Sequence, residues 1–201
     1  MGMRVLIACE FSGVVREAFR SRGHDAWSCD ILPALDNSPY HYQCDVLDIL
    51  DDEWDLMIAH PPCTYFTNSG VSWLHKDPER WSKLDEAAVF FNALLDADIP
   101  KICIENPVPH KYALERIGGR KYTQLIHPYQ FGHLEQKATC LWLKNLPPLK
   151  HTSDLRVQTK SLPIQQKQRI LWMGDNKDGK RSITFNGFAD AMASQWSIDW
   201  V

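Results

Sequence analysis

The stretch Leu-Met-Ile-Ala-His-Pro-Pro-Cys at residues 56–63 decides the fold class. Its first four residues form a short apolar run, which is typical of a strand buried on both faces of a parallel sheet. Proline cannot continue a strand ladder, so the chain has to leave the sheet at Pro61. Ligands of open α/β sheets bind beyond the carboxyl ends of the strands. We therefore expect Cys63 to lie on a loop at such an edge, with an accessible thiol.

A second apolar run, at residues 99–104, ends in a similar way. It leads into Glu105-Asn106-Pro107, which we expect to follow the end of the strand. Because the carboxyl ends of parallel strands meet at one edge of a sheet, a thiol and a carboxylate at these two ends can share one crevice.

The rest of the chain alternates between strand and helix patterns. Strand patterns cover residues 4–9, 24–29 and 139–143 in addition to the two runs above. Apolar residues recur at helical spacing in residues 14–21, 78–97, 111–117 and 187–196. This alternation predicts an α/β fold.

Composition bounds the class of protein. The chain has 201 residues, of which 44% are hydrophobic and 23% charged, which suits one soluble domain with a small appendage. No apolar run approaches the roughly 20 residues of a membrane span, and no signal-peptide pattern is present, so we expect a cytoplasmic protein. Six cysteines without a Cys-x-x-Cys pair favour reduced thiols over disulfides or a metal site. The net charge of −3 gives no overall attraction to nucleic acid.

Residues 150–182 differ from the rest in charge. They contain eight lysines and arginines against three aspartates. Such a segment is either a solvated, partly flexible excursion or a surface that contacts nucleic acid, and the base rate favours the first.

A series of motifs in this order resembles those of DNA cytosine-C5 methyltransferases, and the resemblance is to the short, phage-like members. The motifs with the same order and compatible spacings are Phe11-Ser12-Gly13, Asp30, Asp45, Pro61-Pro62-Cys63, Glu105-Asn106-Pro107, Gln136-Lys137 and the segment at 186–191. The resemblance covers most of residues 4–149 and 181–196. The resemblance implies the doubly wound, Rossmann-like sheet of the class I methyltransferases. It also implies that the protein acts in the cytoplasm of a bacterial or phage-infected cell.

The resemblance also implies a covalent chemistry. Carbon 5 of a pyrimidine is a poor nucleophile until a thiolate adds at carbon 6, and Cys63 is the residue that resembles this nucleophile. Glu105 resembles the acid that hydrogen-bonds or protonates ring nitrogen 3. In duplex DNA the target base then has to be flipped out of the stack.

S-adenosyl-L-methionine is the implied methyl donor. Asp30 fits a contact to the ribose hydroxyls, and Asp45 a contact to the adenine amino group. The full set of residues implied to bind the cofactor is Phe11, Ser12, Gly13, Asp30, Asp45, Pro61, Gly187 and Ala189. The set implied to bind the substrate is Asn106, Gln136, Lys137, Arg169 and Arg181.

The chain also departs from the family pattern. Val14-Val15-Arg16 stands where the family commonly has a glycine-rich turn, and the arginines that normally follow the glutamine motif are missing after Lys137. Lys137, Arg169 or Arg181 can replace the base-contacting arginine. In place of a target-recognition domain there is only a very small basic insertion at 150–181, so the methyltransferase domain is expected to comprise residues 1–149 and 182–201.

Two other functions remain open. One is a related enzyme that modifies a pyrimidine in a free nucleotide, or that transfers a group other than methyl, as the small recognition segment suggests. The other is a catalytically inactive protein that keeps the fold and binds DNA or a partner, as the altered glycine turn suggests.

Several aromatic residues and histidines are expected to have structural roles. Trp73, Trp81, Phe90 and Phe91 fit core packing or loop anchoring better than base stacking. The histidines, His60 among them, lack metal-ligand spacing, which favours surface or packing roles.

Overall fold

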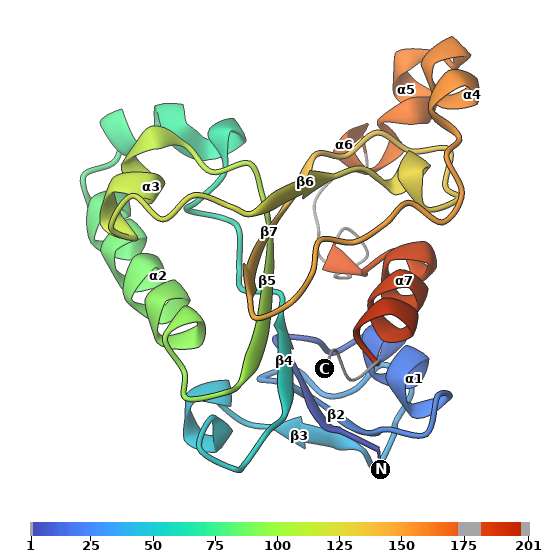
Figure 1. The fold of residues 1–201 in the computed structure, drawn as a ribbon. Helices are drawn as coiled ribbons and strands as arrows, with labels where there is room; N and C mark the ends of the chain where they lie inside the picture. Colours follow the sequence, from blue (N-terminus) through green and yellow to red (C-terminus); the bar gives the residue numbers. More distant parts are fainter. Residues whose placement is uncertain (1, 173–181, 198–201) are drawn as a thin grey trace.

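The computed structural model describes residues 2–172 and 182–197, and a seven-stranded mixed sheet forms its centre (Figure 1). The strand order is β3-β2-β1-β4-β5-β7-β6. The first five strands in this order are parallel, and β7 runs antiparallel to both β5 and β6. The strand bounds are β1 Arg4–Ala8, β2 Asp25–Asp30, β3 His41–Gln43, β4 Leu56–Ala59, β5 Lys101–Pro107, β6 Gln124–Ile126 and β7 Thr139–Lys144. The predicted α/β, doubly wound fold is confirmed.

Helices cover both faces of the sheet (Figure 1). Helices α1 (Val14–Arg20) and α7 (Asn186–Trp196) pack on one face, where Phe19 and Trp196 belong to one buried apolar cluster. Helices α2 (Glu79–Leu95) and α3 (Lys111–Arg116) pack on the other face, over a second cluster. The short 3-10 helices are η1 Val46–Ile49, η2 Asn68–His75 and η3 Pro128–Gln130. Burial on both faces explains why β4 is a continuous apolar run.

Three features of the sheet differ from the sequence prediction. Strands β3 and β6 lie outside the strand patterns predicted from the sequence, because three residues are too few to show a periodicity. Strand β5 extends to Pro107, so Glu105 lies within the strand and not after it. The reason is β7, whose Leu141 pairs with Glu105 and whose Thr139 pairs with Pro107.

The strand order reverses between β1 and β4, since β2 and β3 lie on one side of this pair and β5 on the other. The backbone N–H of His60 still donates to the carbonyl of Ala8, at 2.9 Å, just after β4 has ended. Such a reversal leaves a crevice beyond the carboxyl ends of the two strands.

The part of the basic segment that the structure describes, up to Trp172, contains the short helices α4 Arg156–Ser161, α5 Ile164–Lys167 and α6 Arg169–Trp172. Helices α4 and α5 project away from the sheet at the upper right of Figure 1. The segment is nevertheless tied to the loop before β7, because the N–H of Leu155 donates to the carbonyl of Tyr129 at 2.7 Å and that of Ile170 donates to the Glu135 carboxylate at 3.0 Å. Within the described ranges, no helix has the length and apolarity needed to cross a membrane.

Candidate functional site

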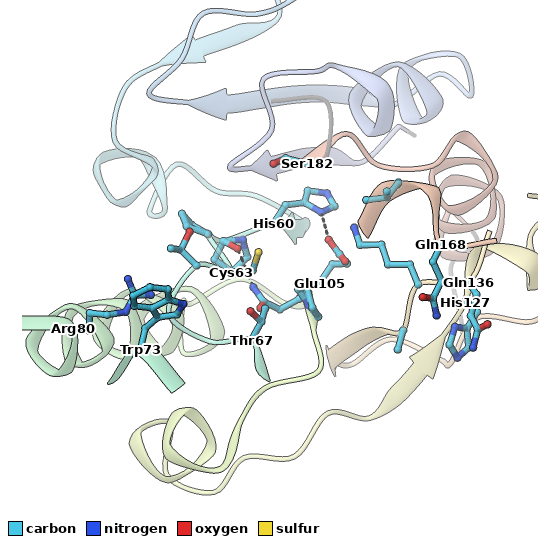
Figure 2. Close-up of a pocket in the computed structure, with 18 residues that line it drawn as sticks. His60, Cys63, Thr67, Trp73, Arg80, Glu105, His127, Gln136, Gln168 and Ser182 are labelled. Carbon is cyan, nitrogen blue, oxygen red and sulfur yellow. Dashed lines mark hydrogen bonds and ion pairs between the residues drawn. The ribbon is translucent and has the colours of Figure 1, made fainter. Parts of the chain in front are cut away.

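A cavity of about 930 Å³ lies beyond the carboxyl ends of β4 and β5 (Figure 2). Cys63 and Glu105 both line it, together with Asn106, Gln136 and Lys137. These residues come from the loop after β4, from β5 and from the segment before β7. The structure therefore brings the two predicted catalytic residues and three of the predicted substrate-binding residues to one cavity.

Cys63 is held by the loop that follows the two prolines. Its carbonyl accepts hydrogen bonds from the N–H groups of Phe66 and Thr67, at 3.0 and 3.2 Å, which closes a turn around it. Nearby, the Asn106 side chain is buried, and its Nδ2 donates to the carbonyl of Pro61 at 2.9 Å. Asn106 thus fixes the proline segment to β5 from within the cavity wall.

The thiol of Cys63 differs from those of the other five cysteines because its residue is exposed. Burial raises the pKa of Cys9 to about 12 and that of Cys140 to about 12. Burial also raises the pKa of Cys29 and of Cys103 above the ordinary value. A thiolate is the reactive form of cysteine, so buried thiols with raised pKa values are poor nucleophiles. The cavity therefore holds the thiol with the best access to a substrate.

Glu105 is paired with a histidine. Nδ1 of His60 lies 3.1 Å from Oε2 of Glu105, and the two side chains are 8% and 17% exposed. Burial raises the pKa of Glu105, but the hydrogen bond from His60 and the positive charge of Lys137 outweigh burial, so the pKa lies below its ordinary value. The carboxyl group is thus set between two cationic or proton-donating side chains.

The two ends of the cavity have different linings. In Figure 2, Trp73 and Arg80 lie at one end, Gln136, His127 and Gln168 lie at the other, and Cys63 and Glu105 lie between them. Trp73 is 54% exposed, contrary to the expectation that it anchors the core or a loop. It lies on η2, a short helix beside the cavity, and the Nζ of Lys76 is 4.9 Å from its ring centroid.

Five of the residues predicted to bind the cofactor lie at or after the carboxyl ends of β1, β2 and β3 and do not line this cavity: Phe11, Ser12, Gly13, Asp30 and Asp45. Pro61, which follows β4, does line it. Asp30 and Asp45 both lie close enough to Cys9 for their charges to add to the burial that raises the pKa of its thiol. One oxygen of each aspartate accepts a backbone N–H, from Leu32 at 2.9 Å and from Leu47 at 3.0 Å. The two carboxylates are therefore oriented by local turns on the same edge of the sheet.

The turn at 11–13 is the tightest part of this region. Gly13 has a φ of 75°, a left-handed conformation that strains any other residue. A Cβ at Gly13 would lie 2.9 Å from Oδ2 of Asp36 and would also meet the guanidinium of Arg16. Ser12 donates from its hydroxyl to the Glu10 carboxylate at 3.2 Å.

Arg16 lies in the part of the sequence where the resembled family commonly has a glycine-rich turn. Its side chain is completely buried and bonds to Ser28, at 2.8 Å, and to Asp36. The N–H of Leu35 donates to the carbonyl of Phe11 at 2.9 Å, so the loop after β2 lies against the turn. The departure from the glycine pattern therefore has a structural counterpart, in which an arginine cross-links the turn to this loop.

The remaining predicted residues have other surroundings. The N–H of Gly187 donates to Nε2 of His133 at 3.0 Å, and a Cβ there would collide with the Phe131 carbonyl, so close packing requires this glycine. Ala189 is buried in the apolar cluster under α7. Arg169 is exposed and pairs with Glu135 at 3.6 Å, although its neighbours Gln168 and Ile170 line the cavity. Arg181 lies outside the described residues.

Sequence reasoning missed Trp73 and His60 as parts of the site. Trp73 shares no spacing with the family motifs, and only its exposure beside the cavity marks it. His60 directly precedes the two prolines, so its place at a strand end was a signal that could have been used. Among the described residues, no group of three or more His, Cys, Asp or Glu side chains is arranged to hold a metal ion.

The sequence matches no family model, and no curated protein is significantly similar to it. Solved structures with a similar fold include the following three proteins, all of which are named as methyltransferases. The Entamoeba histolytica methyltransferase EhMeth has a TM-score of 0.50 and 17% identity, over 77% of this chain and 58% of its own. A protein assigned as a DNA modification methyltransferase encoded within an E. coli prophage has a TM-score of 0.48 and 17% identity, over 71% and 46% of the two chains. The S. pombe Dnmt2 methyltransferase has a TM-score of 0.47 and 18% identity, over 84% and 57%.

This chain thus spans about half the length of the solved structures it matches. At such low identity the similarity concerns the fold, and at that level it agrees with the resemblance drawn from the motifs. The chain therefore has the α/β fold of the Rossmann-like methyltransferases.

Proposed function

We propose that this protein methylates carbon 5 of cytosine in DNA, with S-adenosylmethionine as the methyl donor and Cys63 as a covalent nucleophile. The observation that carries the proposal is that the exposed Cys63 thiol and the Glu105 carboxyl line one cavity at the carboxyl edge of a methyltransferase-type sheet. Addition of a thiolate to a pyrimidine requires these two groups on either side of the same ring.

The chemistry proceeds in balanced steps. The Cys63 thiolate forms a bond to carbon 6, and the displaced ring electrons are neutralised at nitrogen 3 by the proton of the Glu105 carboxyl. Carbon 5 is now an enamine carbon and takes the methyl group. Loss of the carbon 5 proton to solvent then expels the thiolate, and the proton on nitrogen 3 returns to Glu105.

The cofactor residues fit S-adenosylmethionine in chemical type. The two carboxylates of Asp30 and Asp45 accept hydrogen bonds, which suits ribose hydroxyls and an adenine amino group. The left-handed Gly13 lets the backbone come close to a ligand at the start of α1. When bound, this cofactor supplies a methyl group attached to a positively charged sulfur. Arg16 keeps the turn and the loop after β2 together while the donor is held.

The rim of the cavity favours a polymeric substrate over a free nucleotide. Trp73 is largely exposed, Lys76 lies over its ring, and Arg80 lines the same cavity with its guanidinium over the ring of Tyr65. An aromatic platform flanked by cations is typical of sites that bind unstacked nucleic-acid bases and the backbone between them. We assign residues 1–149 and 182–201 to the methyltransferase domain and the basic segment at 150–181 to DNA contact.

The test is a mass measurement of the protein after incubation with DNA that contains 5-fluorocytosine, in the presence of S-adenosylmethionine. Fluorine at carbon 5 cannot leave as a proton does, so the thiolate remains bonded to carbon 6. We expect a covalent complex with the wild type, and none with Cys63→Ala. The matched control, Cys29→Ala, removes a buried thiol from β2 and should still form the complex.

Two results would overturn the proposal. A complex with 5-fluoro-deoxycytidine monophosphate but not with DNA would indicate an enzyme that acts on nucleotides. The lack of a complex with either substrate, in a protein that binds the cofactor or DNA, would indicate a catalytically inactive binding protein.

A further inference from the structure

His60 lies where the two halves of the sheet meet. Strand β4 pairs in parallel with β5, and Ala59 is opposite Ile104 at the last step of the ladder. The next residues in this register are His60 and Glu105, and their side chains are hydrogen-bonded at 3.1 Å, as the dashed line in Figure 2 marks. The contact therefore follows directly from the register of two neighbouring strands.

The imidazole acts on two carboxyl groups. It is hydrogen-bonded to Glu105 in the cavity, and its charge partly offsets the burial that raises the pKa of Glu10. Glu10 itself accepts the N–H groups of Val15 and Arg16 at 2.7 and 3.2 Å, which orders the first turn of α1. His60 is therefore in contact with one of these carboxyl groups and within electrostatic reach of the other.

The second ring nitrogen of His60 distinguishes it from a packing histidine. Nε2 is buried and has no hydrogen-bond partner among the described residues. By contrast, His24 bonds to Met3 and Ser197, and His110 to Ala113 and Tyr65, so that both nitrogens of each ring are satisfied. A buried polar atom without a hydrogen bond destabilises the fold, and a catalytic role is one reason for such an atom to be present.

We propose that His60 is a positioning residue for the proposed methyl transfer, which holds the Glu105 carboxyl at the cavity wall and exchanges a proton with it. This inference rests on the function proposed above. In this step the protonated imidazole passes its Nδ1 proton to the Glu105 carboxylate and becomes neutral, and the resulting acid donates this proton to nitrogen 3 of the pyrimidine as Cys63 adds to carbon 6. When the thiolate leaves, the same proton returns through Glu105 to Nδ1, so that the pair is restored.

The charged groups around this pair set its proton balance. Among the described residues, two charged groups act on the pair of His60 and Glu105. One is Glu10, after the end of β1, which interacts with His60, and the other is Lys137, before β7, which interacts with Glu105. Because Lys137 and His60 both favour the ionised carboxyl of Glu105, a nearby proton source is needed to return this group to its acid form. His60 is the group in hydrogen-bonding contact with that carboxyl.

The experiment compares His60→Ala and His60→Asn with the wild type by the rate at which the Cys63 complex forms on 5-fluorocytosine DNA, over a pH range of about 5.5 to 9. Alanine removes both the hydrogen bond and the proton, and should slow the reaction by about 100-fold. Asparagine keeps an N–H donor near the position of Nδ1 but cannot titrate. It should recover part of the rate and give a flatter pH profile than the wild type.

His24→Asn serves as the matched control, since it removes a hydrogen-bonded histidine at the other end of β1 and should leave rate and pH profile unchanged. Wild-type rates and profiles in both His60 variants would overturn the inference. So would parallel losses of rate, cofactor affinity and melting temperature with an unchanged pH profile, because these indicate a structural role alone. If the wild type itself forms no complex, the proposed function fails first, and the two failures are thereby distinguished.

Discussion

The carboxyl edge of the sheet has two parts that are built in different ways: the proposed catalytic edge at the ends of β4 and β5, and the proposed cofactor edge at the ends of β1 and β2. At the ends of β4 and β5, Cys63 and Glu105 line an open cavity of about 930 Å³. At the ends of β1 and β2, the turn around Gly13 is packed against the buried side chain of Arg16. The side chains of Cys63 and Glu105 face an open cavity, whereas the space beside the Gly13 turn is occupied by the side chain of Arg16.

The difference shows which parts of a site a sheet can determine. Neighbouring strand ends bring side chains together through register, and this holds for Cys63 and Glu105 whatever surrounds them. The shape of a ligand-binding turn depends instead on which side chains fold back over it. Substitutions at the two edges should therefore affect different measurements.

The largest effect is expected at the catalytic edge. Glu105→Gln removes the proton that nitrogen 3 requires, so turnover should fall by about 10²- to 10⁴-fold. Steady-state methyl transfer to cytosine-containing DNA measures this, and cofactor affinity should stay within about twofold because Glu105 is not among the proposed cofactor contacts. Glu86→Gln, which breaks only a surface pair with Lys83, is the control. A loss of cofactor binding in Glu105→Gln would mean that the two edges are not separate.

The converse effect is expected at the cofactor edge. Asp30→Asn removes a charged acceptor at the end of β2 and should weaken S-adenosylmethionine binding by about 10- to 150-fold. Calorimetric titration measures the affinity. Asp25→Asn, at the amino end of the same strand, changes the same chemical group away from this edge and should leave the affinity unchanged. Equal losses in the two variants would contradict the cofactor assignment.

The rim of the cavity should affect binding of DNA more than turnover. Trp73→Ala removes the exposed ring and should weaken binding to single-stranded DNA by about 5- to 150-fold, while Trp73→Phe keeps most of the affinity. Lys76→Gln should instead lower the slope of affinity against salt concentration by about one unit. Fluorescence anisotropy at several salt concentrations separates the two. An unchanged affinity in Trp73→Ala would show that the Trp73 ring does not bind the DNA.

The smallest effect tests the filled turn itself. Gly13→Ala places a methyl group on a left-handed backbone and against Arg16 and Asp36, so the free energy of unfolding should fall by about 2 kcal/mol. Gly23→Ala is the matched control, because its φ is also positive, at 84°, and nothing lies within 4 Å of the added methyl group. It should cost about 1 kcal/mol, the backbone strain alone. Urea denaturation measures both free energies of unfolding. Equal losses in the two variants would show that the turn accommodates the added methyl group without a steric clash.

The sequence allowed the fold class and the placement of Cys63 and Glu105 in one cavity to be predicted because both depend on strand ends. The apolar run at 56–59 and the two prolines after it are enough to place Cys63 at the edge of the sheet. Glu105 was placed beside it correctly in space, although it lies within β5, since the antiparallel partner β7 cannot be recognised from the residues of β5.

The features that were not predicted depend on contacts between distant residues. No pattern indicates that the guanidinium of Arg16 turns back to Ser28 and Asp36, which are 12 and 20 residues away. Exposure of Trp73 depends on how η2 lies beside the cavity, and not on the local sequence. Histidine has no strong preference for either surface or core, so the pairing of His60 could not be inferred from its type.

The two prolines after β4 also make the site sensitive to chain length. Pro61 and Pro62 have no N–H groups to donate. Beyond Ala59 the contacts that join β4 and β5 are therefore made by side chains, with His60 bonded to Glu105 and Asn106 bonded to the carbonyl of Pro61. The residues of each pair are 45 apart in the sequence. A deletion of one residue within β5 would move Glu105 to the opposite face of the sheet and Asn106 into its place. Natural variants of this chain are therefore expected to keep the length of β5, and of the segment from Ala59 to Cys63, unchanged.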